Sequence, residues 1–161
     1  MPTNFLLAPG TNGFIATPFN LVSTELNALA STETIVSSVG GASGVFDQDN
    51  TASAMFGSIW FICGGALNPT AGGLLRGWFL RSTDGGTTFE RAVADTAQPR
   101  APDFVIPLFD AAYAVSEVAW AQEIRVELPA ESFRVAIQNV AGATLPATGN
   151  LILLGPTAVA Y

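Results

Sequence analysis

Histidine and lysine are both absent from this chain of 161 residues, and cysteine occurs once, as Cys63. Without histidine or lysine, the chain cannot build a Ser-His-Asp triad, a Cys-His pair, a Schiff base or a histidine-ligated zinc site. One cysteine cannot form an intramolecular disulfide, and the apolar neighbours Phe61 and Ile62 indicate a buried thiol. We therefore expect no catalytic residues, no cofactor and no enzymatic activity.

Charge is scarce as well. Thirteen acidic residues and six arginines give a net charge of −7, and charged residues make up 12% of the chain, compared with about 25% in typical soluble domains. The arginines are scattered and form no basic stripe for phosphate groups, so we expect no binding to nucleic acid. An acidic chain is also repelled by anionic membrane surfaces. Much of the folded surface must be uncharged, or covered by a partner.

A membrane segment is the next class to consider, because residues 50–75 contain no charge and are long enough to cross a bilayer. Two glycine pairs and Asn68-Pro69-Thr70 interrupt this tract, which favours two strands joined by a loop. The first ten residues lack the basic start and the long apolar stretch of a signal peptide. We expect neither a membrane span nor this route of secretion.

Carboxylates are the remaining titratable groups, and two pairs stand two or four residues apart: Asp47 with Asp49, and Glu123 with Glu127. Nothing in the sequence encloses either pair in apolar surroundings, so we interpret both as solvated and not as a glycosidase pair. The segment that begins at Asp47 lacks the glycine and the glutamate that an EF-hand needs at its sixth and twelfth positions. A calcium site in this loop stays open, and we assign no metal ligand.

Short apolar runs separated by glycine and proline dominate the rest of the chain, and no long amphipathic helix occurs. This pattern predicts a single all-β domain, an antiparallel β-sandwich of about eight short strands with at most one or two helical turns. The uniformly apolar run 58–63 predicts a strand covered on both faces. We expect a helical turn at 24–30 and strands at 33–39, 58–63, 74–82, 87–93, 103–109 (an edge strand), 123–128, 133–138 and 151–154.

Two of these segments, 123–128 and 133–138, alternate cleanly between apolar and polar residues. We predict that they form an antiparallel hairpin that sets Val126 opposite Val135 and Glu127 opposite Arg134. The apolar face would fix the register, and the ion pair would agree with it.

The sequence 82–89, Ser-Thr-Asp-Gly-Gly-Thr-Thr-Phe, resembles the Asp box of sialidase-type propeller blades. In that family the box is a structural hairpin without catalytic function. A propeller repeats it in each blade, whereas this chain has one copy and no internal period. We interpret Asp84, Gly85 and Gly86 as a structural hairpin turn in which Asp84 accepts from turn amides.

The first 22 residues are apolar, uncharged and interrupted by proline and glycine. We interpret residues 1–22 as an extended arm that packs on a neighbouring subunit or as a first strand, and residues 23–161 as the sandwich domain. Aromatic side chains dominate the centres of protein interfaces, although a core role is favoured over a contact role for each tryptophan, because large aromatic residues are highly buried on average. The candidate contacts are Phe5, Leu6, Leu7, Phe14, Ile15, Phe19, Trp60, Trp78 and Trp120.

Several stretches together resemble small β-sandwich decoration (cement) proteins on the heads of tailed bacteriophages. The stretches are 24–30, 70–73, the turn at Asp84, 128–135 and 139–150. The resemblance implies a jelly-roll-like sandwich that forms dimers or trimers and binds across junctions between subunits of the major capsid protein. Such a protein is made in the host cytoplasm and ends on the outer surface of the virion. The alternative is a carbohydrate-binding or tail-associated adhesion module, suggested by the Asp-box-like turn and the tryptophans.

Overall fold

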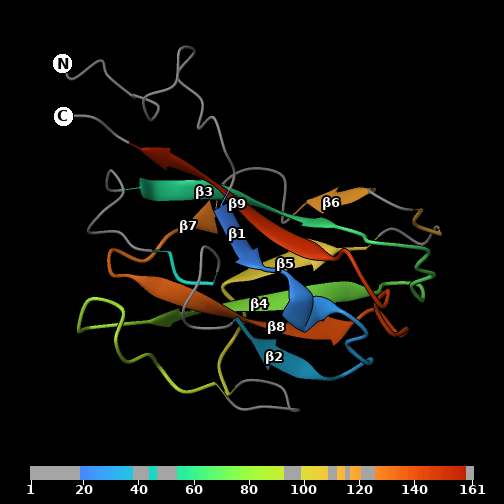
Figure 1. Ribbon diagram of the computed structural model, residues 1–161, viewed down its shortest axis with the longest axis horizontal. Helices are drawn as coiled ribbons and strands as arrows, with labels where there is room; N and C mark the ends of the chain where they lie inside the picture. Colours follow the sequence, from blue (N-terminus) through green and yellow to red (C-terminus); the bar gives the residue numbers. More distant parts are fainter. Residues whose placement is uncertain are drawn as a thin grey trace.

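The computed structural model describes residues 19–37, 44–46, 54–92, 99–108, 112–114, 117–120 and 126–158. The regular secondary structure of this part of the chain consists of β-strands and one short 3-10 turn, η1 (Thr24–Leu26) (Figure 1). Its strands are β1 (Phe19–Val22), β2 (Thr34–Val36), β3 (Ala54–Ile62), β4 (Leu74–Arg81), β5 (Phe104–Pro107), β6 (Val118–Trp120), β7 (Val126–Glu127), β8 (Phe133–Val140) and β9 (Leu151–Ala158).

The strands form two antiparallel sheets. Sheet A has the order β1-β9-β3-β6, with β7 also paired to β3, and sheet B has the order β2-β8-β4-β5. Because β6 and β7 occupy the same position beside β3, each sheet has four strand positions, and the chain passes back and forth between the sheets. This strand order is that of a jelly roll. The antiparallel β-sandwich that the sequence predicts is therefore confirmed.

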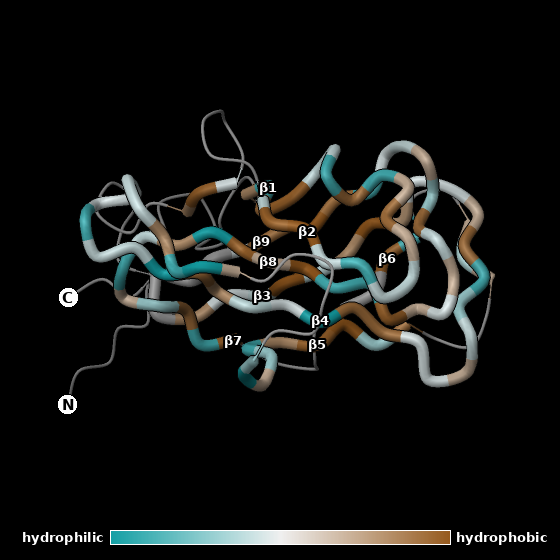
Figure 2. Tube along the Cα trace, turned by 90° about the horizontal axis from the view of Figure 1, so that it is seen from below, coloured by the Kyte–Doolittle hydropathy of each residue, from teal (hydrophilic) through white to brown (hydrophobic). Residues whose placement is uncertain are grey.

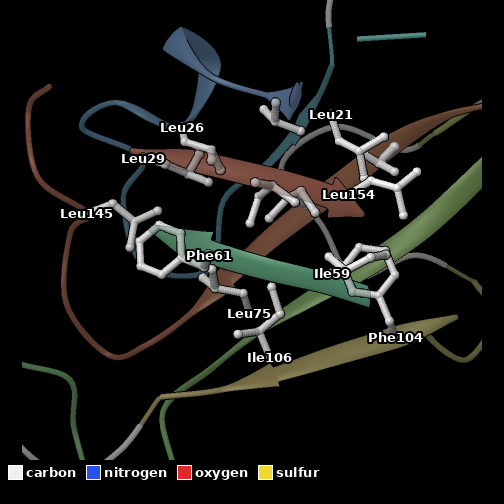
Figure 3. Packing of buried hydrophobic residues seen from close by; sticks show 14 of the residues in the cluster. Leu21, Leu26, Leu29, Ile59, Phe61, Leu75, Phe104, Ile106, Leu145 and Leu154 are labelled. Atoms are coloured by element: carbon white, nitrogen blue, oxygen red, sulfur yellow. The ribbon is translucent and has the colours of Figure 1, made fainter. Parts of the chain in front are cut away.

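The core lies between the two sheets, where every second residue of each long strand is buried (Figure 3). Phe133 and Phe79 of sheet B meet at a centroid distance of 4.8 Å, and Phe133 also stacks on Phe46 at 5.2 Å. Apolar segments run through the strands, whereas polar segments gather in the loops at both ends of the sandwich (Figure 2). The inward residues include Leu21, Ile59, Phe61, Leu75, Phe79, Phe104, Ile106, Phe133, Val135, Ile137, Ile152 and Leu154.

The predicted pairing of 123–128 with 133–138 is wrong. β7 pairs with β3, setting Val126 opposite Gly57 in sheet A, while β8 pairs with β2 and β4 in sheet B. Residues 128–132 carry the chain from one sheet to the other. The alternation correctly identified the buried side of each segment, but two apolar faces can meet across a core as well as side by side in one sheet.

Two further expectations need correction. The segment 87–92 forms no strand, and the neighbours of β4 are β5 and β8. Along β3 the inward Ile59 and Phe61 are completely buried, while the outward Trp60 and Ile62 are only half-buried. This strand is therefore packed on one face, not on both. The edge strand expected at 103–109 is confirmed as β5, the last strand of sheet B.

Candidate functional site

The outer face of sheet B is covered by its own chain. Trp78 projects outward from β4, yet it is only 2% exposed, and its indole Nε1 donates a hydrogen bond of 3.0 Å to the carbonyl of Arg100. Of the two roles considered for Trp78 from the sequence, a buried packing residue and a contact for a partner, the structure shows the buried one. The small cluster on this face consists of Trp78, Leu80 and Ala136, with Val36, Phe89 and Ala92 packed against it.

An arginine and an aspartate fasten the covering segment to the sheet. The Arg100 guanidinium donates to both carboxylate oxygens of Asp103 at 2.8 Å and to the carbonyl of Phe79 at 2.6 Å. Asp103 in turn accepts from the amide of Phe79 at 2.7 Å. Nearby, Arg134 lies 4.9 Å from the centroid of the Phe89 ring, and burial lowers the pKa of its guanidinium. These charges serve to close this face.

Both carboxylate oxygens of Asp84 accept hydrogen bonds from residues of its own turn. Its Oδ1 accepts from the Ser82 hydroxyl at 2.8 Å and from the amides of Thr87 and Thr88 at 3.2 and 2.7 Å. Its Oδ2 accepts from the Thr88 hydroxyl at 2.6 Å. The hydrogen bond from the Thr88 side chain is the largest cause that lowers the pKa of Asp84 to about 2. The geometry is that of a structural turn, with no carboxylate oxygen directed at a ligand.

Buried amides are likewise engaged by the fold. The Asn139 side chain is fully buried, donates to the carbonyls of Leu29 and Ala143, and accepts from the amide of Ala141. Asn150 plays the same role between the segment that follows η1 and the start of β9, and its Nδ2 donates to the carbonyl of Pro146 at 2.6 Å. Both side chains hold loops together and offer no binding group.

Cys63 and the carboxylate pairs offer no reactive centre in the described residues. Burial is the largest cause that raises the pKa of the Cys63 thiol, whose Sγ donates to the carbonyl of Gly65 at 3.0 Å. Asp47, Asp49 and Glu123 lie outside the described residues, and Glu127 is exposed on β7. No group of metal-binding side chains occurs within the described ranges. The same ranges contain no helix with the length and hydropathy of a membrane span.

The outer face of sheet A differs from that of sheet B in that the outward positions of its two central strands carry no charge. Its outward positions alternate with the buried core residues of β3 and β9, and the register sets Trp60 opposite Leu153 and Ile62 opposite Leu151. Among the described strands of this sheet, Glu127 is the one charged residue at an outward position. The outer face of sheet A comprises Phe56, Ser58, Trp60, Ile62, Val118, Leu151, Leu153 and Gly155.

These side chains belong to neither buried cluster of the described chain. Val118 is 39% exposed, Leu153 is 8% exposed, and Trp60 is half-buried. The Trp60 ring lies close to Gly155, where an added β-carbon would stand 3.1 Å from Cη2 and Cζ3 of the ring. The outward positions of sheet A are therefore apolar, uncharged apart from Glu127, and mostly half-buried, with Val118 as the exposed large apolar side chain among the described residues.

The residues that the sequence predicted as contacts lie in different places in the structure, and several of them lie outside the described residues. Phe19 is the first residue of β1, which pairs with β9 in sheet A. Its ring contacts the Phe46 ring edge-on at a centroid distance of 5.4 Å. Trp120 is the register partner of Trp60, and its side chain lies outside the described residues. Phe5, Leu6, Leu7, Phe14 and Ile15 also lie outside the described residues.

Sequence reasoning missed Ile62, Val118, Leu151 and Leu153 as members of this surface. The sequence could have indicated an outward apolar position for Ile62, Leu151 and Leu153, since the segments 58–63 and 151–154 are apolar without alternation. A strand that is apolar on both sides must either be covered twice or present one apolar face outward. Comparison of the chain with protein-family models, with curated proteins and with solved structures found no match.

Proposed function

We propose that this protein is a structural component of a tailed-bacteriophage head, which decorates the outer capsid surface and stabilises it by binding across major capsid protein subunits. The observation that carries the proposal is the apolar outer face of β3 and β9, which carries no charge on a chain with a net charge of −7. The jelly-roll order supports it, because this architecture is common among viral capsid and lectin domains. Since a fold alone does not define function, the sequence resemblance supplies the second line of support.

A decoration protein acts by binding energy, not by chemistry. It must be a rigid body whose surface is buried against subunits of the intact shell, so that the shell gains stability by mass action. The aromatic core makes the sandwich rigid. The side chains of Asp84, Asn139 and Asn150 form hydrogen bonds to the backbone of its loops and hold them in place. The polar side chains therefore support a scaffold, while apolar surface remains for association.

The test begins with mass spectrometry of purified virions from the phage that encodes this chain. The protein should be present in many copies per particle. Shells prepared without it should bind the added protein on sedimentation and should then disassemble at a higher temperature than bare shells. Absence from the particle, together with no binding to shells, would overturn the proposal.

A carbohydrate-binding adhesion module is the second candidate, and the half-buried Trp60 at an outward position of β3 favours it. Glycan-array binding that disappears in Trp60→Ala and persists in Trp78→Phe would support this candidate over the first. If no glycan on the array is bound, the carbohydrate-binding candidate is excluded. The Asp84 turn no longer argues for this candidate, because its carboxylate is engaged internally.

A further inference from the structure

We infer that the outer face of sheet B binds an extended acidic segment of another protein, whose carboxylates pair with Arg76 and Arg134. The inference rests on the proposed function for the identity of this partner on a shell, and it adds the surface and the chemistry of the contact. The contact is a property of this face, so it can be tested without a capsid.

Both charged residues at outward positions of sheet B are arginines. Alternation with the buried residues of β4 and β8 turns Arg76 and Arg134 outward, and both are half-buried. The outward positions of β2 and β5 carry no charge. All five arginines within the described residues belong to sheet B or to the segment 82–103 that follows β4. The folded chain therefore gathers on one side the cations that are scattered in the sequence.

The carboxylates of the covering segment are already engaged. Asp103 and Glu90 lie 2.8 and 3.7 Å from the Arg100 guanidinium. Arg76 and Arg134, in contrast, form no salt bridge with any carboxylate in the part of the chain that the structure describes. Their charge therefore stays available to a partner.

Hydrogen bonding on this face is incomplete. Within the described residues, two buried side-chain atoms have no hydrogen-bond partner, Arg134 Nε and Gln138 Oε1. Gln138 is 5% exposed and is the register partner of Arg76. Arg134 packs on the Phe89 ring and so helps to close the face, but its partly buried charge has no anion beside it. Buried groups without partners are rare in native structures, and two of them on one face indicate a surface that a partner completes.

Spacing and chemistry indicate a polypeptide as the occupant. Gln138 lies four residues beyond Arg134 on β8 and opposite Arg76 on β4, so the two arginine positions are about 13 Å apart along the sheet. Carboxylates four residues apart on an extended segment span the same distance. A polypeptide supplies carboxylates for arginine and amide donors for a glutamine oxygen, whereas phosphate groups supply acceptors alone. The net charge of −7 also repels a long polyanion, which favours a short acidic segment over nucleic acid.

The experiment uses the full chain and a fluorescein-labelled peptide of about ten glutamates, with binding followed by fluorescence anisotropy at low salt. The peptide should bind, and its affinity should fall as salt is added. Arg134→Gln and Arg76→Gln should each weaken binding about tenfold, because each removes a charge-assisted pair. Arg134→Lys should have an intermediate affinity, since lysine keeps the charge and lacks the planar fork.

Val118→Glu is the matched control. It lowers the net charge by one unit, as each glutamine variant does, but it lies on sheet A, where Val118 is 39% exposed. It should leave the affinity for the peptide nearly unchanged, and circular dichroism confirms that each variant is folded. Equal weakening by Val118→Glu would overturn the inference, because overall charge would then explain the binding.

Failure of the peptide to bind would also overturn the inference, as would tighter binding of a thymidine strand of about ten nucleotides. Peptide binding by a protein that does not bind shells refutes the proposed function alone. Shell binding that neither Arg76→Gln nor Arg134→Gln weakens, together with no peptide binding, refutes this inference alone.

Discussion

The ring of Phe104 on β5 lies directly against the α-carbon of Gly77, its register partner on β4. A β-carbon at residue 77 would overlap three atoms of this ring. The glycine thus lets an aromatic residue of the edge strand fold over its neighbour and enter the core, where Phe104 meets Phe79 at a centroid distance of 5.4 Å. This contact anchors the edge strand β5 to the core.

Gly77→Ala should destabilise the protein by about 1–3 kcal/mol, because the Phe104 ring must move out of a packed site. Urea denaturation followed by tryptophan fluorescence measures the free energy of unfolding. Since the cost arises from one contact, Gly77→Ala should cost less in a Phe104→Leu background than in the unmodified protein. Equal costs in both backgrounds would contradict the contact.

The Asp84 turn should respond to acid within a defined window. The pKa of Asp84 is lowered to about 2 in the folded protein, against about 3.9 in an unfolded chain. Its contribution to stability is therefore complete above about pH 4 and is lost as the pH falls toward about 2. Unfolding free energies of the unmodified protein and of Asp84→Asn, measured from pH 5 to pH 2, should converge in this window. A constant difference would contradict the assignment.

The same turn allows a direct test of cause. The hydroxyl of Thr88 donates to Asp84, and this hydrogen bond is the largest cause of the lowered pKa. Thr88→Val should therefore raise the pKa of Asp84, as followed by NMR of the side-chain carboxyl carbon. Ser82→Ala should raise it by a smaller amount, because the hydrogen bond from Ser82 ranks lower among the causes. The reverse order would refute the ranking.

Asn139 should be among the least replaceable polar residues. Asn139→Ala strips the amide of Ala141 and the carbonyl of Ala143 of their partner, which costs about 2–4 kcal/mol. Asn139→Asp places a carboxylate against two carbonyls, and burial raises the pKa of that carboxyl above its unfolded value. The stability of Asn139→Asp should thus fall as the pH rises from about 4 toward 7, while Asn139→Ala should show no such additional decrease.

The two tryptophans on opposite outer faces should differ under the same substitution. Trp78→Phe removes a hydrogen bond to a covered carbonyl and leaves a void under the loop, at a cost of about 1–3 kcal/mol. Trp60→Phe should cost less than about 1 kcal/mol, because Trp60 is only half-buried and therefore loses less buried area. Urea titrations followed by fluorescence measure both costs. Equal costs would show that both faces are covered alike.

The sequence alone predicted which residues are buried along a strand. Alternation with a period of two identified Phe133, Val135 and Ile137 as one inward face, and all three are completely buried. It also located the Asp84 turn and the edge strand that contains Pro107, because these features depend on local chemistry: side-chain acceptors for turn amides, and a residue without an amide hydrogen.

Which strands are neighbours was decided only by the tertiary structure. Glu127 is opposite Phe56 in sheet A, while Arg134 is opposite Leu80 in sheet B, so the expected ion pair across one hairpin does not form. Alternation specifies a face and carries no information about the partner strand. In a jelly roll most partners are distant in sequence, and β9 lies between β1 and β3.

The candidate surface shows the same division. Trp60 and Trp78 both stand at outward positions of central strands in apolar surroundings, and local sequence does not distinguish them. The segment anchored by Arg100 covers Trp78, whereas Val118, on the outer face of sheet A, is 39% exposed. The sequence determined that both outer faces would contain apolar residues. Only the folded chain decided that the face with Trp78 is covered by the segment around Arg100, because such covering depends on where a distant loop packs.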